Sequence, residues 1–139
     1  MAAQVALGQT AGVVFSQIYG GGGNAGATLK NDFVELFNRT DAPVALEGWK
    51  FEYASATGEF TQSTALVGTI PANGYYLIAQ AAGAGGTVDL PTPDVSGSIA
   101  MSATAAKVRI VRADGAGGVD ELLGAVKYDG FFAAGCGVR

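Results

Sequence analysis

Residues 13–39 read VVFSQIYGGGGNAGATLKNDFVELFNR, in which a glycine-rich run separates two segments of alternating apolar and polar side chains. Alternation with a period of two predicts half-buried β-strands, here over residues 12–19 and 32–38. The glycines between them are too frequent for a helix or a regular strand. This part of the chain is therefore expected to form a strand, a loop and a second strand.

Successive side chains of a strand point to opposite faces. In the first of the two strands, Val14, Ser16 and Ile18 are therefore expected on one face. The other face is expected to carry Val13, Phe15, Gln17 and Tyr19.

The rest of the chain repeats the pattern of short strands between turn residues. The clearest case is residues 49–54, where Trp49, Phe51 and Tyr53 share one face and charged residues the other. Trp49 is expected at the centre of the core, since an indole buries more area than any other side chain of this chain. Further strands are expected over residues 44–46, 59–64, 65–70, 75–79, 98–101, 107–112 and 122–128.

Short strands at this spacing predict an all-β sandwich or barrel, and no segment keeps a helical period for three turns. The strand at 75–79 is almost wholly apolar and is expected to be central. Residues 81–97 are expected to form a long loop rich in glycine and proline, of a length that is often functional. A length of 139 residues indicates one domain. The expected divisions are an N-terminal arm at 1–11, a sandwich at 12–130 and a C-terminal tail at 131–139.

The composition of the chain argues against some classes of binding partner. Charged residues make up 14% of the chain, against about 25% in ordinary proteins, and the net charge is −4 without any run of Lys or Arg. Nucleic-acid and anionic membrane surfaces need clustered positive charge, so neither is expected as a partner. No apolar stretch reaches the ~18 residues of a membrane span.

The N-terminus, MAAQVALGQTAG, lacks the basic region and long apolar core of a signal peptide. Two interpretations remain, a cytoplasmic protein or an exported protein without its signal. Few Lys and Glu with many Gly, Ala, Thr and Ser favour a secreted or cell-surface location. Cys136 is the single cysteine. It is expected to be a small buried apolar residue, one half of an intermolecular bridge, or a half-cystine whose partner was lost by truncation.

No catalytic group of residues stands out. The chain contains no His, which removes the commonest general base, the Ser-His and Cys-His nucleophile systems and ordinary zinc sites. A phosphate-binding P-loop would need Gly-Lys-Ser/Thr opening a helix, whereas Lys30 is followed by Asn31 and an expected strand. No enzyme activity and no cofactor are expected.

Calcium is the one metal for which the sequence offers ligands. Asp32 and Glu35, with Asn24, supply the oxygen atoms that Ca²⁺ prefers. Asp32 and Glu35 are three residues apart in a strand, so they point to opposite faces unless a bulge intervenes. The other expectation for Glu35 is a hydrogen bond or an ion pair with Arg39 or Lys50. A second set of loop carboxylates comprises Asp89, Asp94 and Asp114.

Three segments in order resemble the lamin-tail domain family: NDFVELFNRTDAPVALEGWKFEY at 31–53, TIPANGYYLIA at 69–79 and KVRIV at 107–111. The family has an acidic, apolar strand ending in Asn, then a turn, a hydrophobic residue before Gly-Trp, and a Pro/Gly turn into a Tyr-Leu strand. The residues that fit are Asp32, Phe33, Val34, Glu35, Leu36, Asn38, Leu46, Gly48, Trp49, Pro71, Gly74, Tyr76 and Leu77. GGGGN at 20–24 and ASATG at 54–58 resemble the bacterial, secreted branch.

The resemblance implies an immunoglobulin-like β-sandwich that binds or anchors within exported or surface proteins and does not catalyse. This chain departs from that usage because it has no room for an enzyme domain. The part after Val126 is also short for the family's last strands. We therefore expect an all-β, immunoglobulin-like β-sandwich with long Gly-rich loops.

Two functions follow as hypotheses. The first is a non-catalytic extracellular interaction or adhesion module, in which the loops at 20–31 and 81–97 carry recognition of a protein. The alternative is a self-assembling subunit of a surface fibre or layer, a homo-oligomer joined through its termini and sheet edges. Low charge and the aromatic pair Phe131 and Phe132 favour this alternative, with the pair as the interaction residues.

Overall fold

The computed structural model describes residues 12–113 in full and the backbone of residues 119–127. This part of the chain is all-β, as predicted, with no helix. No helix long and apolar enough to cross a membrane occurs among the described residues. The expected arm at 1–11, the tail at 131–139, Phe131, Phe132 and Cys136 lie outside them.

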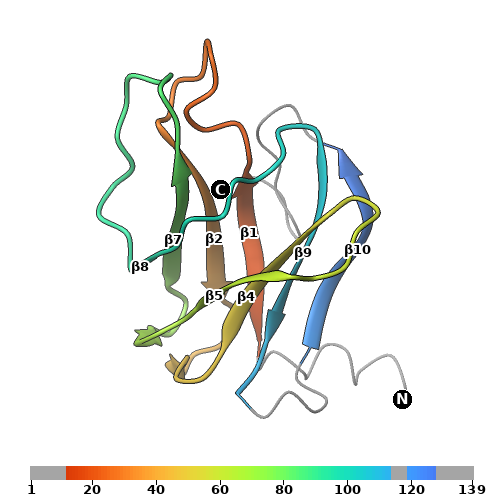
Figure 1. Cartoon of the computed structure of the whole chain (residues 1–139). Helices are drawn as coiled ribbons and strands as arrows, with labels where there is room; N and C mark the ends of the chain where they lie inside the picture. Colours follow the sequence, from red (N-terminus) through yellow and green to blue (C-terminus); the bar gives the residue numbers. More distant parts are fainter. Residues whose placement is uncertain (1–11, 114–118, 128–139) are drawn as a thin grey trace.

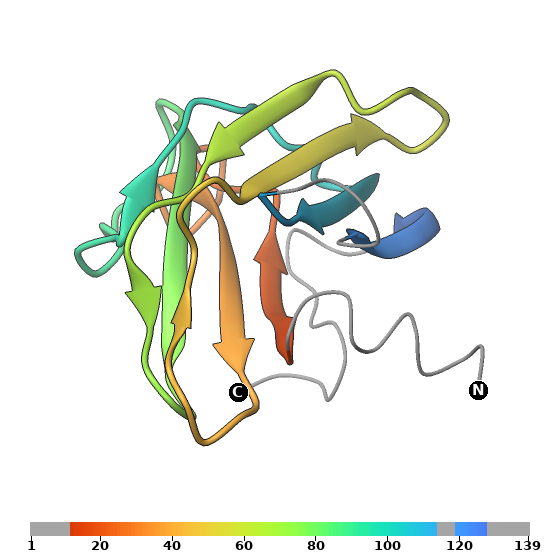
Figure 2. The ribbon, with the colours of Figure 1, turned by 90° about the horizontal axis from the view of Figure 1, so that it is seen from below.

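Two four-stranded sheets form the separate layers of a sandwich (Figures 1 and 2). The first sheet has the order β1 (Val13–Tyr19), β2 (Asn31–Asn38), β7 (Tyr75–Ala82) and β8 (Val95–Ser96). The second has the order β10 (Val119–Lys127), β9 (Ala105–Val111), β4 (Lys50–Ser55) and β5 (Gln62–Ala65). A two-stranded pair is formed by β3 (Val44–Ala45) and β6 (Thr69–Ile70). The pairings between these named strands are antiparallel, except that of β7 with β8.

The core lies between the two sheets and contains the predicted aromatic face. Trp49, directly before β4, is 6% exposed, and Phe51 and Tyr53 of β4 are buried in the same core cluster. Phe51 meets Phe15 of the opposite sheet edge to face, with ring centroids 6.3 Å apart. Burying large aromatic side chains supplies much of the stabilisation of such a core. The expectation of two layers of strands packed over Trp49 is therefore confirmed.

Alternation along β1 is interrupted, which corrects the expected phase of this strand. Phe15 pairs with Leu36 and Gln17 with Glu35, so Ser16 is an extra residue in the ladder, a β-bulge. As a result Ile18 returns to the core side used by Phe15, and both are buried. The bulge inserts one residue into β1, so the buried positions change from odd to even residue numbers after Ser16. The same face of the strand stays buried throughout.

The segment at 81–97 also differs from the expected loop. β7 continues to Ala82, and β8 within this segment completes the first sheet by pairing in parallel with β7. No strand forms at 98–101; instead Ile99 and Met101 are buried in an irregular segment. The amide of Ile99 donates to the side chain of Gln80 at 3.0 Å, and the carbonyl oxygen of Ile99 accepts from the amide of Ala81 in β7 at 3.1 Å.

Buried polar side chains form hydrogen bonds at one end of the sandwich and between its two layers. At one end Asn38, fully buried, accepts from the amide of Thr40 and donates to the carbonyl oxygens of Ala42 and Ile70. Between the layers the Gln80 amide donates to the hydroxyl of Thr64 at 2.9 Å, which joins β7 to β5. Among the described residues no buried side-chain nitrogen or oxygen lacks a partner. The sandwich therefore tolerates these polar groups because each is satisfied.

Candidate functional site

Two loops that are distant in the sequence meet at one end of the first sheet, at the top of the view in Figure 1. We call residues 20–30 and 83–90 the paired loops. Backbone hydrogen bonds join them, from Gly83 to Lys30, from Lys30 to Val88 and from Val88 to Thr28. Parts of the two segments expected to carry recognition, 20–31 and 81–97, thus lie against each other.

The glycine run at 20–23 allows this close approach. Gly23 has φ +75°, and a Cβ atom built on it would lie 2.2 Å from the backbone nitrogen of Gly83. No side chain fits at that distance, and the backbone conformation itself favours glycine. Across the outside of the paired loops, the Lys30 ammonium lies 3.1 Å from the Asp89 carboxylate. The glycine run therefore allows the two loops to pack directly against each other.

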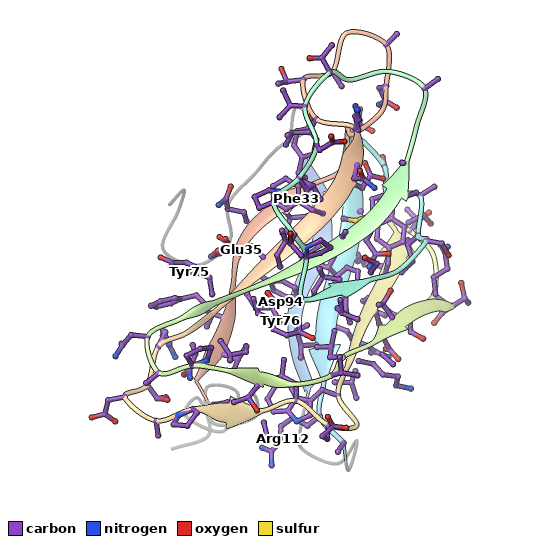
Figure 3. All side chains as sticks on the ribbon, turned by 90° about the vertical axis from the view of Figure 1, so that its left-hand side faces the viewer. Phe33, Glu35, Tyr75, Tyr76, Asp94 and Arg112 are labelled. Atoms are coloured by element: carbon purple, nitrogen blue, oxygen red, sulfur yellow. The ribbon has the colours of Figure 1, made fainter. Side chains whose placement is uncertain are left out.

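A hollow of about 200 Å³ lies below the paired loops, on the outer face of the first sheet. The sheet supplies its floor and residues of the paired loops, together with Pro91, its rim. Figure 3 shows Phe33 and Glu35, two of its lining residues, along β2. The full lining is Gln17, Leu29, Phe33, Glu35, Leu77, Leu90 and Pro91. Most of these side chains are apolar, and a single carboxylate lies among them.

That carboxylate belongs to Glu35, which is 5% exposed. It accepts hydrogen bonds from the hydroxyl of Ser16 and, at 2.9 Å, from the amide of Gln17. The expectation that Glu35 forms hydrogen bonds is confirmed, with donors on the neighbouring strand. Lys50, one of its expected partners, lies 3.7 Å from Glu52. Ser16 is the bulge residue of β1, so the irregularity of that strand brings a donor to Glu35.

Asp94 anchors the segment that follows the rim of the hollow to β7. The amide of Asp94 donates to the carbonyl oxygen of Leu77, and the amide of Leu77 donates to the Asp94 carboxylate at 2.7 Å. Because Leu77 also lines the hollow, this double contact fixes the returning segment beside it. Asp94, a candidate calcium ligand, is therefore held by a backbone amide.

Asp32 lies on the core side of β2 and holds two loops in place. Its two carboxylate oxygens accept from the amides of Gly22, at 2.8 Å, and Met101, at 2.7 Å. Burial raises the pKa of the Asp32 carboxyl above its usual value, and the two amide hydrogen bonds partly oppose that rise. This residue joins the paired loops to the segment that covers the end of the sandwich.

The calcium candidates occupy three different surroundings. Val34 and Leu36 point to the core, so Asp32 shares their face of β2 while Glu35 points outward, as the spacing predicts. Asn24 is exposed within the paired loops. Among the described residues no group of three or more His, Cys, Asp or Glu side chains could hold a metal ion. Asp114, of the second candidate set, lies outside the described residues.

The outer face of the second sheet differs in chemistry. Arg109 lies 2.6 Å from a Glu52 oxygen and stacks over the ring of Phe60, 4.1 Å from its centroid. Lys107 lies over the same ring at 5.6 Å. This face therefore carries charged side chains, whereas the hollow is mostly apolar.

Sequence reasoning found Glu35 but not the other groups around it. Gln17 and Ser16 were assigned by simple alternation, and the bulge that brings both to Glu35 leaves no sequence signal. Leu77 could have been found, since it occupies the outward phase of β7. Leu90 and Pro91 reach the hollow only because the segment folds back on the sheet.

A model of the lamin tail domain family matches residues 8–123, most of the chain. A search of curated proteins found no match.

Proposed function

This chain belongs to the lamin tail domain family, whose members are immunoglobulin-like and generally non-catalytic, and we propose that it is an extracellular interaction or adhesion module that recognises a protein through its paired loops. We place it with the bacterial, secreted members of the family. The proposal includes a secreted or cell-surface location, which the low content of charged residues supports.

The joined surface of the paired loops carries this proposal. A sandwich positions loops rigidly, and loops on such scaffolds are common sites of recognition. Here the hydrogen bonds between the loops fix their relative position before any partner binds. Val88 is 45% exposed on this surface, next to the ion pair of Lys30 and Asp89. A preorganised surface loses less conformational entropy when it binds. The exposed apolar side chain of Val88 offers a contact for a partner.

Site-specific crosslinking tests the proposal. A photoreactive p-benzoylphenylalanine replaces Val88 in the paired loops or, as control, Ser63, which is exposed on β5. The protein is expressed in its own host and irradiated on intact cells. We expect a discrete crosslinked protein from position 88 and none from position 63. No product at 88, or the same product from both positions, would contradict recognition by the paired loops.

The same cells test the location. An antibody against the folded domain is applied to intact cells and to the culture fluid, with a cytoplasmic protein as control for lysis. We expect signal outside the cell while the control stays inside. Detection only after lysis would contradict the extracellular part of the proposal and leave the interaction part standing.

Self-assembly is the second candidate, and strand β5 favours it. This four-residue strand, QSTA, lies at the edge of the second sheet and carries no charge. Charged residues on edge strands are a common protection against pairing with a neighbour, and β5 lacks them. Light scattering over a range of concentrations tests this candidate. Growth of the mass with concentration, lost on deletion of residues 1–11, supports a fibre or layer subunit, and a strict monomer contradicts it.

A further inference from the structure

We propose that the partner protein binds the paired loops by adding an extended strand alongside residues 87–89, which we call the strip. This inference rests on the proposed function, because it names the way in which that partner is recognised. The strip belongs to the second of the paired loops, at the outside of the sandwich (Figure 1). Its three residues, Thr87, Val88 and Asp89, are all exposed.

The backbone of the strip is already paired on one side. The amide of Val88 donates to the carbonyl oxygen of Thr28 at 2.9 Å, and the amide of Lys30 donates to the carbonyl oxygen of Val88 at 3.0 Å. These two bonds make a parallel β-bridge between Leu29 and Val88. Val88 therefore directs both of its backbone groups toward the first of the paired loops.

The other side of the strip offers a donor and an acceptor. Alternate residues of an extended segment direct their backbone groups to opposite sides, so the Thr87 carbonyl oxygen and the Asp89 amide point away from the first loop. Neither group has a hydrogen-bond partner within the part of the chain that the structure describes. A partner residue can donate to Thr87 and accept from Asp89, which repeats the parallel bonding of Val88. Main-chain bonds of this kind provide the affinity when a strand is added to an exposed edge.

The side chains of the strip restrict the sequence of the partner. Val88 is 45% exposed, and a strand beside it would place a side chain directly against it. The Asp89 carboxylate is 81% exposed and lies 3.1 Å from the Lys30 ammonium. An acidic side chain next to Asp89 would be repelled. The partner segment is therefore expected to carry an apolar residue at the level of Val88 and no acidic residue beside Asp89.

The same charge disfavours a second copy of this chain as the occupant. Two copies paired in parallel at the strip would set Asp89 against Asp89, and like charges opposite each other destabilise a pair of strands. Pro91 and Pro93 cannot donate to a ladder of hydrogen bonds, so the strip cannot extend far beyond Asp89. A short edge with a charged residue fits one partner strand better than the growth of a continuous sheet.

Substitutions at position 89 separate the backbone from the side chain. Asp89→Pro removes the amide N–H, whereas Asp89→Ala removes the carboxylate and keeps the N–H. Thr92→Pro places the same ring at an exposed position outside the strip and serves as the control. Each variant carries the photoreactive residue at position 88, which is itself apolar, and is irradiated on intact cells. The yield of crosslinked product is normalised to the amount of folded protein.

We expect about tenfold less product with Asp89→Pro, because one main-chain hydrogen bond is lost and the ring obstructs the added strand. Asp89→Ala and Thr92→Pro should give the yield of the unchanged protein. An unchanged yield with folded Asp89→Pro, or an equal loss with Asp89→Ala, would overturn the proposal.

Hydrogen exchange tests the strip without altering its backbone, and it decides the matter should Asp89→Pro fail to fold. Exchange at single amides is measured in the purified crosslinked product and in the same protein before irradiation. We expect the Asp89 amide to exchange about tenfold more slowly in the product, since it then donates a hydrogen bond. The Thr92 amide should exchange equally in both. Equal exchange of the Asp89 amide in both would overturn strand addition.

These results are distinguishable from a failure of the proposed function. No product from position 88 with the unchanged strip contradicts the interaction module itself, and strand addition with it. A product that folded Asp89→Pro leaves intact overturns strand addition while the interaction module remains. A product that consists of two copies of this chain overturns the assignment of the strip to a different protein.

Discussion

The Ser16 hydroxyl donates a hydrogen bond to the Glu35 carboxylate across the pair of β1 and β2. Ser16 is the extra residue of a β-bulge, and Glu35 lies opposite its neighbour Gln17. Bulges often re-aim a side chain at a functional position. Here the bulge brings two donors to one nearly buried acid, which makes a carboxylate tolerable among apolar side chains.

Ser16→Ala tests this relationship. The change leaves Glu35 with one donor fewer, and an under-satisfied buried charge destabilises a protein by about 1–3 kcal/mol. We expect a loss of that size in the free energy of unfolding, measured by urea titration. Ser63→Ala, at an exposed position of β5, should stay within about 0.5 kcal/mol of the unchanged protein. Equal effects of the two changes would show that the hydrogen bond contributes nothing.

The contact between the paired loops is tested by two glycines with similar backbone angles. Gly26 has φ +85° with open space around it, so Gly26→Ala should lower the free energy of unfolding by about 1–2 kcal/mol through the backbone alone. Gly23→Ala meets the backbone of Gly83 as well and should be clearly more destabilising. The measurement is a thermal melt of each variant. Equal melting temperatures would mean that the loops are not packed as described.

Asp32 gives a pH dependence whose sign is fixed by its burial. Burial raises the pKa of this carboxyl above its ordinary value of 3.8, so between the unfolded-state and folded-state pKa values the native state binds more protons than the unfolded state does. Its contribution to stability is therefore fully present below pH 3.8 and is lost as the pH rises through the folded pKa. The variant Asp32→Asn lacks this titration. We expect the unfolding free energy of the unchanged protein minus that of the variant to fall with rising pH, and an increase would contradict a raised pKa.

Removal of divalent metal should leave the described domain unchanged. Asp32 is engaged by the amides of Gly22 and Met101, and Glu35 by groups on the opposite face of the sheet. These carboxylates cannot converge on one ion without breaking those bonds. We expect the same melting temperature in EDTA and in calcium, measured by differential scanning calorimetry. A melting temperature raised by calcium and restored to its EDTA value on chelation would instead support a structural ion.

The strands that face the core could be read directly from the sequence. Trp49, Phe51 and Tyr53 alternate with charged residues, and a half-buried strand produces that pattern whatever its neighbours are. The apolar strand at 75–79 was likewise predicted to be central, and β7 lies between β2 and β8. The ordered motifs around Asn38 and Trp49 indicated the family.

The candidate site could not be read in the same way. The bulge at Ser16, the return of Leu90 and Pro91 to the sheet, and the joining of two loops at Gly23 and Gly83 each depend on segments far apart in the chain. A bulge leaves the composition of a strand unchanged, and only its partner strand reveals the extra residue. Local pattern therefore determined the layers and the core, because burial imposes a period on each strand by itself. Only the tertiary structure decided which polar groups meet Glu35 and what encloses it, because such contacts are set by strand register and loop packing.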